Sequence, residues 1–120
     1  MTCEVEYTDE IEKWWEALDV EEQISISASV SLLEQFGTNL KYPHSSQILG
    51  SKYRLRELRT QHKGRPYRTL YAFDPRRNAI LLIAGDKTEN KRWYEINVPI
   101  AEQLYAQHLL ELKQEGLLDG

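Results

Sequence analysis

The sequence KYRLRELRTQHKGRPYRTLYAFDPRRNAILLIAGDKTENKRWY, residues 52–94, contains three segments with the apolar pattern of β-strands. They are the run around Leu55 and Leu58, the alternating run from Tyr67 to Phe73, and the unbroken apolar run 79–84. The connections 61–65 and 74–78 are short and rich in residues that favour turns. The pattern predicts an antiparallel meander, and the third strand, apolar on both faces, is expected to be the most buried.

The same stretch concentrates positive charge. It holds twelve of the fifteen Lys and Arg residues against four acids, a balance of +8 in a chain of net charge −4. Residues 1–34 hold ten acids and one Lys, so the two signs are segregated along the sequence. A segregated basic segment is typical of a surface that meets a polyanion. The acidic segment is interpreted first as a solvated face whose negative charge balances the positive charge of the rest of the chain.

The N-terminal part alternates over Cys3 to Tyr7, which predicts a short strand at a sheet edge. Thr8 or Asp9 can cap a first helix, whose apolar residues Ile11, Trp14, Trp15 and Leu18 share one face. Asp19 can cap a second helix over 20–36 that ends at Gly37. The two helices are expected to form an antiparallel hairpin, followed by a loop over 37–51.

The C-terminal part predicts one more helix. Pro99 suits a first helical position, and apolar residues continue at helical spacing to Leu112 before Gly116. The whole chain of 120 residues is the length of one domain, 1–120. Together the elements predict an α+β fold.

Several classes of protein are disfavoured by composition. The chain is 41% hydrophobic and 28% charged, which is typical of a globular domain. It has no apolar run of membrane-spanning length and no signal-peptide pattern, so a cytoplasmic location is expected. The single Cys3 cannot form an internal disulfide, and no Cys/His cluster has metal-ligand spacing. Chemistry by side chains, without metal or cofactor, is therefore expected.

The signature LRELR…GRPYRTLYAFDPRRNAILLIAGDKT…RWYE, preceded by a helical hairpin, resembles the RelE/ParE superfamily of toxins from bacterial type II toxin–antitoxin systems. It looks most like the phage-derived, HigB-type branch. The resemblance implies a RelE-like fold with an antiparallel sheet of three to four strands packed on helices. It also implies a metal-independent endoribonuclease that cleaves mRNA on the ribosome. A cognate HigA-like antitoxin with a helix-turn-helix would neutralise it in a heteromeric complex.

The resemblance also suggests roles for individual residues. Arg68 matches the strand arginine that contacts the scissile phosphate, and Lys87 stands near a second basic catalytic position. Tyr94 resembles a C-terminal aromatic residue that stacks on a base or takes part in proton transfer. RelE has two lysines on the first strand of the meander, where this chain has Leu55 and Glu57, so its acid and base assignments cannot be copied.

Metal-free RNA cleavage by the ribose 2′-hydroxyl needs a base, an acid and fixed positive charge. Arginine suits the last role because its planar fork binds two phosphate oxygens and stays protonated. Strand alternation places Glu57 and Arg59 on one face. Glu57 is a candidate base, although neighbouring arginines would lower its pKa. His62 is a further candidate, as base or acid, because imidazole titrates near neutrality.

Further basic and aromatic residues are candidates for RNA contact. The basic residues at turns could reach phosphates. Trp93 and Tyr94 could either stack on a base or pack the last helix on the sheet. The candidates are Arg56, Lys63, Arg65, Arg76, Arg77, Lys91, Arg92 and Trp93.

Two other functions stay open at this point. One is a non-catalytic toxin of the ParE type that inhibits DNA gyrase through protein contacts. The other is an inactive phage-derived module that only binds its partner, which the loss of the two lysine positions to Leu55 and Glu57 keeps possible.

Overall fold

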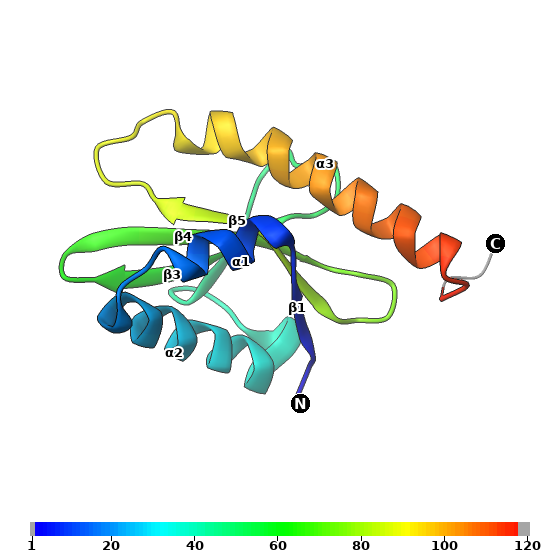
Figure 1. Cartoon of the computed structure of the whole chain (residues 1–120), viewed down its shortest axis with the longest axis horizontal. Helices are drawn as coiled ribbons and strands as arrows, with labels where there is room; N and C mark the ends of the chain where they lie inside the picture. Colours follow the sequence, from blue (N-terminus) through cyan, green and yellow to red (C-terminus); the bar gives the residue numbers. More distant parts are fainter. Residues whose placement is uncertain (1, 118–120) are drawn as a thin grey trace.

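The computed structural model describes residues 2–117 of the chain, so Met1 and residues 118–120 lie outside the described part. Its centre is one five-stranded sheet with the order β1-β5-β4-β3-β2 (Figure 1). The strands are β1 (Val5–Tyr7), β2 (Ser45–Gln47), β3 (Arg56–His62), β4 (Arg65–Phe73) and β5 (Ala79–Asp86). Neighbouring strands are antiparallel, except that β1 runs parallel to β5. The predicted α+β fold with its meander is confirmed.

The sheet has one strand more than the three to four expected. β2 lies inside the segment 37–51, which was predicted to be a loop and also contains a short 3₁₀ helix, η1 (Gly37–Asn39). Its sequence, Ser-Ser-Gln, has no apolar alternation, so the strand exists only because it pairs with residues 56–58 of β3. Tertiary pairing, rather than local pattern, creates this edge of the sheet.

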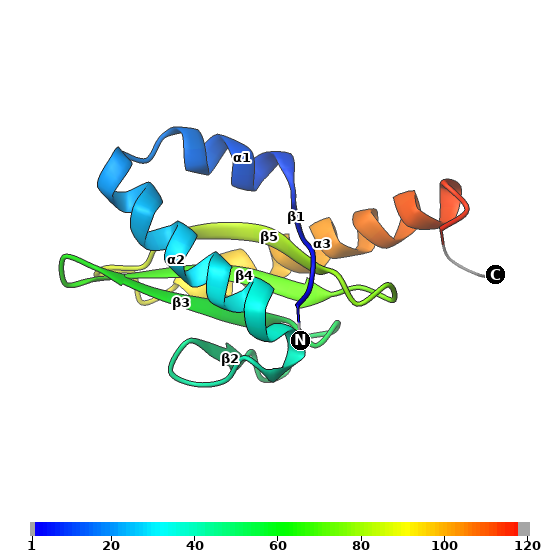
Figure 2. The same cartoon turned by 90° about the horizontal axis from the view of Figure 1, so that it is seen from below.

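Three helices cover the two faces of the sheet. α1 (Asp9–Glu16) packs against β5 and α2 (Val20–Phe36) packs against β3, both on one face, whereas α3 (Trp93–Gln114) covers the other (Figure 2). The predicted caps are present. The Thr8 hydroxyl accepts the Ile11 N–H at 3.2 Å, and Asp19 and Glu22 form a reciprocal capping box. No helix within residues 2–117 is both long and apolar enough to cross a membrane.

The start of α3 differs from the prediction. The helix begins at Trp93, six residues before Pro99, which therefore lies inside it. Trp93 is 4% exposed and packs on the core beneath α3, so burial of this side chain fixes the first turn. A proline inside a helix removes one backbone hydrogen bond, and here the packing of the preceding turn outweighs that loss.

Burial is highest in the middle of the sheet. Six of the nine β4 residues are buried, against four of eight in β5, so the prediction that the third strand is the most buried was wrong. The reason is topology: β4 lies between β3 and β5, whereas β5 has only the three residues of β1 on its other side. The second half of β5 is therefore partly exposed, and it leads to the loop before α3.

Candidate functional site

Polar side chains from β3, β4 and the first turn of α3 meet on the sheet face that α3 covers. Glu57 and Arg59 point to this face from β3, and Arg68, whose backbone pairs with that of Arg59, points to it from β4. Tyr94 reaches down from α3 to Glu57. These four residues, with Ser46 on β2, are called the Glu57 cluster below.

Glu57 is the centre of this cluster and is only 6% exposed. One carboxylate oxygen, Oε2, accepts the Ser46 hydroxyl at 2.5 Å and Arg59 Nη1 at 3.1 Å. The other, Oε1, accepts the Tyr94 hydroxyl and lies 3.4 Å from Arg68 Nε. A carboxylate has about four acceptor sites, and the three hydrogen bonds from Ser46, Arg59 and Tyr94 occupy most of this capacity.

The cluster shifts two acid–base equilibria. Burial raises the pKa of Glu57, but the hydrogen bonds from Ser46 and Tyr94 and the charges of Arg68 and Arg59 outweigh burial and leave that pKa below its usual value. Burial and the neighbouring Glu57 carboxylate raise the pKa of Tyr94 to about 12. At neutral pH the cluster therefore holds an ionised carboxylate and a protonated phenol.

Arg68 is 6% exposed, and its guanidinium group is held by a hydrogen bond to the backbone. Its Nη1 donates to the Tyr67 carbonyl at 2.9 Å. Within residues 2–117, its buried Nε–H finds no acceptor with hydrogen-bond geometry, although Glu57 Oε1 is close. A buried guanidinium N–H without an acceptor is rare in folded proteins, and a catalytic or binding role is one of the explanations for such a group.

Two neighbours position Tyr94. The Lys87 ammonium lies 5.6 Å from the centroid of the Tyr94 ring, close enough for a cation–π contact. On the other side, Trp93 packs so tightly on β5 that a Cβ at Gly85 would lie 2.9 Å from Trp93 Nε1. The absence of a side chain at Gly85 thus lets the first turn of α3 approach the sheet. Lys87 and Tyr94, two of the predicted site residues, are brought together.

His62 and Arg56 lie on the opposite face of the sheet, beneath α1 and α2. His62 Nδ1 is 2.6 Å from the Ser25 hydroxyl of α2. Arg56 Nε donates to the Ser45 hydroxyl at 3.1 Å and to the Tyr71 hydroxyl at 3.3 Å. The structure does not bring either residue to the Glu57 cluster, and the N–H groups of Arg56 hold β2 to the sheet.

Much of the basic charge predicted to contact RNA is paired with the acidic N-terminal segment. Lys63 Nζ lies 2.5 Å from Glu21, and Arg65 lies 3.7 Å from Glu22 and 3.4 Å from Asp86. The charges that are segregated in sequence therefore meet in space.

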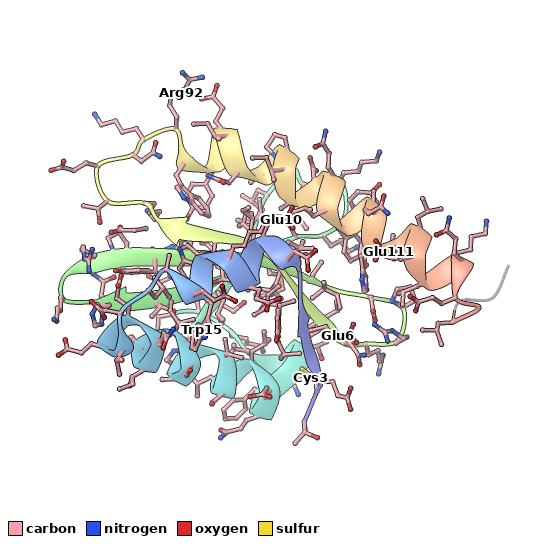
Figure 3. All side chains as sticks on the ribbon, viewed as in Figure 1. Cys3, Glu6, Glu10, Trp15, Arg92 and Glu111 are labelled. Atoms are coloured by element: carbon pink, nitrogen blue, oxygen red, sulfur yellow. The ribbon has the colours of Figure 1, made fainter. Side chains whose placement is uncertain are left out.

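The remaining predicted RNA-contact residues differ in exposure. Arg76 binds Glu6 at 2.9 Å and the buried Asp74 at 2.8 Å. Arg92 pairs with Glu95 at 3.2 Å but extends away from the body of the molecule (Figure 3). Within the described residues, Arg77 and Lys91 are exposed and form no ion pair, which leaves them available to an anionic partner.

Sequence reasoning missed two contributors, Ser46 and Gly85. Ser46 could not be found because its strand carries no pattern, and Gly85 stands out only as a glycine at the end of an apolar run. No three His, Cys, Asp or Glu side chains gather as potential metal ligands in the described part of the chain.

Comparison with known proteins gives both a family and a fold. Residues 13–106 match the family of phage-derived Gp49-like proteins. A relative from Mycobacterium tuberculosis, named "Putative toxin HigB3", is 42% identical over 96 residues, which are 78% of this chain and 82% of that protein. A second from the same organism, "Putative toxin HigB2", is 34% identical over 108 residues, 88% of this chain and 54% of that protein.

Among solved structures, the chain is similar to a mutant of the E. coli toxin RelE in the free state. The TM-score is 0.57, and the match covers 79% of this chain and 94% of that one. At 10% sequence identity, this similarity establishes a shared fold and nothing further.

Proposed function

Because the chain belongs to the family of phage-derived Gp49-like proteins, we propose that it is, as a single domain, the toxin of a type II toxin–antitoxin system. Its relatives are named as HigB toxins, and its fold is that of RelE. We further propose that it cleaves messenger RNA on the ribosome, as an endoribonuclease that needs no metal. The observation that carries this proposal is the buried Arg68 Nε–H without an acceptor, placed beside a carboxylate and a phenol.

In the proposed reaction, Arg68 and Arg59 bind the scissile phosphate. The 2′-hydroxyl of the preceding ribose loses its proton and attacks phosphorus, the bond from phosphorus to the 5′-oxygen breaks, and that oxygen takes a proton. The products are a 2′,3′-cyclic phosphate and a 5′-hydroxyl. The fixed charges of the two guanidinium groups stabilise the extra negative charge of the phosphorane.

Glu57 is the proposed base, in the state with RNA bound. In the free protein its pKa is lowered in part by Arg68 and Arg59, so it is then a weak base. When a phosphate binds Arg68 and Arg59, it neutralises their charge, whereas the burial that raises the pKa of Glu57 remains. Substrate binding therefore strengthens the base at the moment when it is needed.

Tyr94 is the proposed acid. Its raised pKa keeps the phenol protonated at neutral pH, and its hydroxyl already points into the cluster. Lys87, beside the ring, adds positive charge on the side where the leaving oxygen develops negative charge. The partner implied by the family is an antitoxin encoded beside this chain, which we propose to be HigA-like.

The test is induction in a bacterial host of wild type, Arg68→Ala and the control Lys113→Ala, which removes an exposed basic side chain in the last turn of α3. Growth arrest with new message ends, mapped by primer extension, is expected for wild type and Lys113→Ala. Removal of one such charge from a reaction site costs about 10²–10³ in rate, so Arg68→Ala should leave messages intact. Arrest with intact messages in wild type would contradict the proposal and would point to gyrase.

A further inference from the structure

A groove opens at the edge of β3, beside the Glu57 cluster, where β2 has not yet begun. The Arg59 backbone N–H donates to the His44 carbonyl at 2.8 Å, and β2 starts at the next residue, Ser45. Two residues further along β3, Gln61 presents its backbone to the same side, where none of the described strands pairs with it. The volume of the groove is about 470 Å³, within the range of roughly 300–1,000 Å³ for ligand pockets.

The walls of this groove, called the β3-edge groove, come from three elements. α2 contributes Ser25 and Ser29, and the hydroxyl of Ser29 accepts a 2.7 Å hydrogen bond from Thr60, which also lines the groove. The turn before β2 contributes Pro43 and His44 on the opposite side. The exposed Gln61 side chain and the hydroxyls of α2 can both donate and accept hydrogen bonds.

Electrostatics identify the chemical class of ligand. Arg59 and Arg68 both line the groove, and none of its nine lining residues is a carboxylate. The groove is therefore a polar cavity with positive charge at one end. That end adjoins the proposed phosphate site, because Arg59 belongs to both: it lines the groove and also contacts Glu57 at 3.1 Å.

An aromatic side chain stands beside the same arginine. The guanidinium carbon of Arg59 lies 5.2 Å from the centroid of the Tyr42 ring, and Tyr42 is 73% exposed. A large aromatic residue held by a cation–π contact, with most of its surface free, is a platform on which a nucleobase can stack. Arg59 thus joins a phosphate site to a stacking surface.

We propose that the β3-edge groove binds a nucleotide of single-stranded RNA adjacent to the phosphate held by Arg68, with its base against Tyr42. This inference rests on the proposed function and adds to it a site that reads the nucleotide beside the cleaved bond. Phosphate contacts position the strand, whereas hydrogen bonds from Gln61 and His44 to the base edge give preference among bases.

The test uses the full chain, labelled with ¹⁵N, and a short single-stranded RNA whose riboses are all 2′-O-methylated. Such RNA cannot be cleaved by 2′-hydroxyl attack, so binding is measured independently of the reaction. We expect amide shifts at residues 42–44 and 59–61. Tyr42→Ala should weaken affinity about tenfold, and Tyr42→Phe should bind as wild type does. The matched control is Tyr7→Ala, because Tyr7 is 61% exposed at the opposite edge of the sheet.

Equal affinity of Tyr42→Ala and wild type, shifts confined to another surface, or no binding by wild type would overturn the inference. Shifts at 59–61 caused by the antitoxin but not by RNA would make the groove a protein-docking site instead. Binding in the groove together with intact messages after induction would leave the inference standing and remove the proposed cleavage, so the two failures are distinguishable.

Discussion

Arg68 and Glu57 form a buried ion pair across adjacent strands, with Arg68 Nε 3.4 Å from Glu57 Oε1 and the two side chains 7% and 8% exposed. The pair links β4 to β3 in the middle of the sheet, and Tyr94 adds α3 to it. A buried charge without its partner is strongly destabilising, so substitution of either residue should destabilise the fold while the other keeps its charge.

Glu57→Gln removes the negative charge but keeps the shape of the side chain. Because Arg68 is then buried without a counter-charge, the free energy of unfolding should fall by about 3 kcal/mol. The double variant Glu57→Gln/Arg68→Gln should be less destabilised than the sum of the two single variants. Urea unfolding followed by tryptophan fluorescence measures both quantities. Additive losses would show that the pair is not coupled.

Tyr94→Phe removes only a hydroxyl. If Tyr94 is the acid, the rate of message cleavage should fall by about 10²–10⁴, whereas the loss of one hydrogen bond to Glu57 should cost only about 1 kcal/mol of stability. A single-turnover cleavage assay on programmed ribosomes, with thermal unfolding as the control, separates the two effects. A rate within threefold of wild type, roughly, would exclude this role.

Gly85→Ala adds a methyl group where Trp93 Nε1 would lie 2.9 Å from it. The first turn of α3 must then shift, and we expect a loss of about 1–3 kcal/mol together with reduced cleavage, because Tyr94 follows Trp93. Trp93→Phe makes room for that methyl group. The double variant Gly85→Ala/Trp93→Phe should therefore recover stability relative to Gly85→Ala, as measured by thermal unfolding. No recovery would contradict the close contact as the cause.

His62→Ala tests a residue that the sequence suggested as a base or acid and that lies beneath α2, next to Ser25. We expect lower stability, because a buried side chain is lost, and an unchanged cleavage rate per folded molecule. Ser25→Ala, which removes the hydrogen-bond partner alone, is the matched control. A rate that falls with His62→Ala but not with Ser25→Ala would restore the catalytic role.

Stability should depend on pH through Asp74, whose side chain is fully buried. Burial raises its pKa, but hydrogen bonds from His108 and Arg76 and from the backbone of Asn78 outweigh burial and hold the pKa below its usual value. The folded state therefore binds this proton less readily than the unfolded chain does, so the stabilisation is present above the unfolded pKa and is lost as pH falls.

The loss is expected to begin as pH falls through the ordinary pKa of Asp, about 3.9, and to continue below it. Urea midpoints measured across this pH range should fall more steeply for wild type than for Asp74→Asn, which has no carboxyl to titrate at that position. Parallel curves for the two proteins would contradict the assignment.

Much of the fold follows from local pattern. The meander, the apolar face of α1 and the caps of both N-terminal helices are encoded in short stretches of sequence, as at Asp19 and Glu22. β2 and the start of α3 are not, since Ser46 belongs to a strand only through its pairing with Glu57, and Trp93 begins a helix only because it packs beside Gly85. Contacts between distant segments determine these elements.

The same distinction applies to the candidate site. Strand alternation predicted that Glu57 and Arg59 share a face, and the structure places them together with Arg68. Which cations remain free could not be predicted, because ion pairs such as Arg76 with Glu6 join residues that are far apart in sequence. Local charge patterns give the amount of basic charge in a segment but not what neutralises it.

The Glu57 cluster draws on residues that are made at different times. Ser46, Glu57 and Arg68 leave the ribosome before Tyr94 and the helix that holds it. Domains fold as their segments emerge during synthesis, so the sheet can form around an incomplete set of groups. A nascent chain, or one cut short by a premature stop before the codon for Tyr94, therefore lacks the phenol.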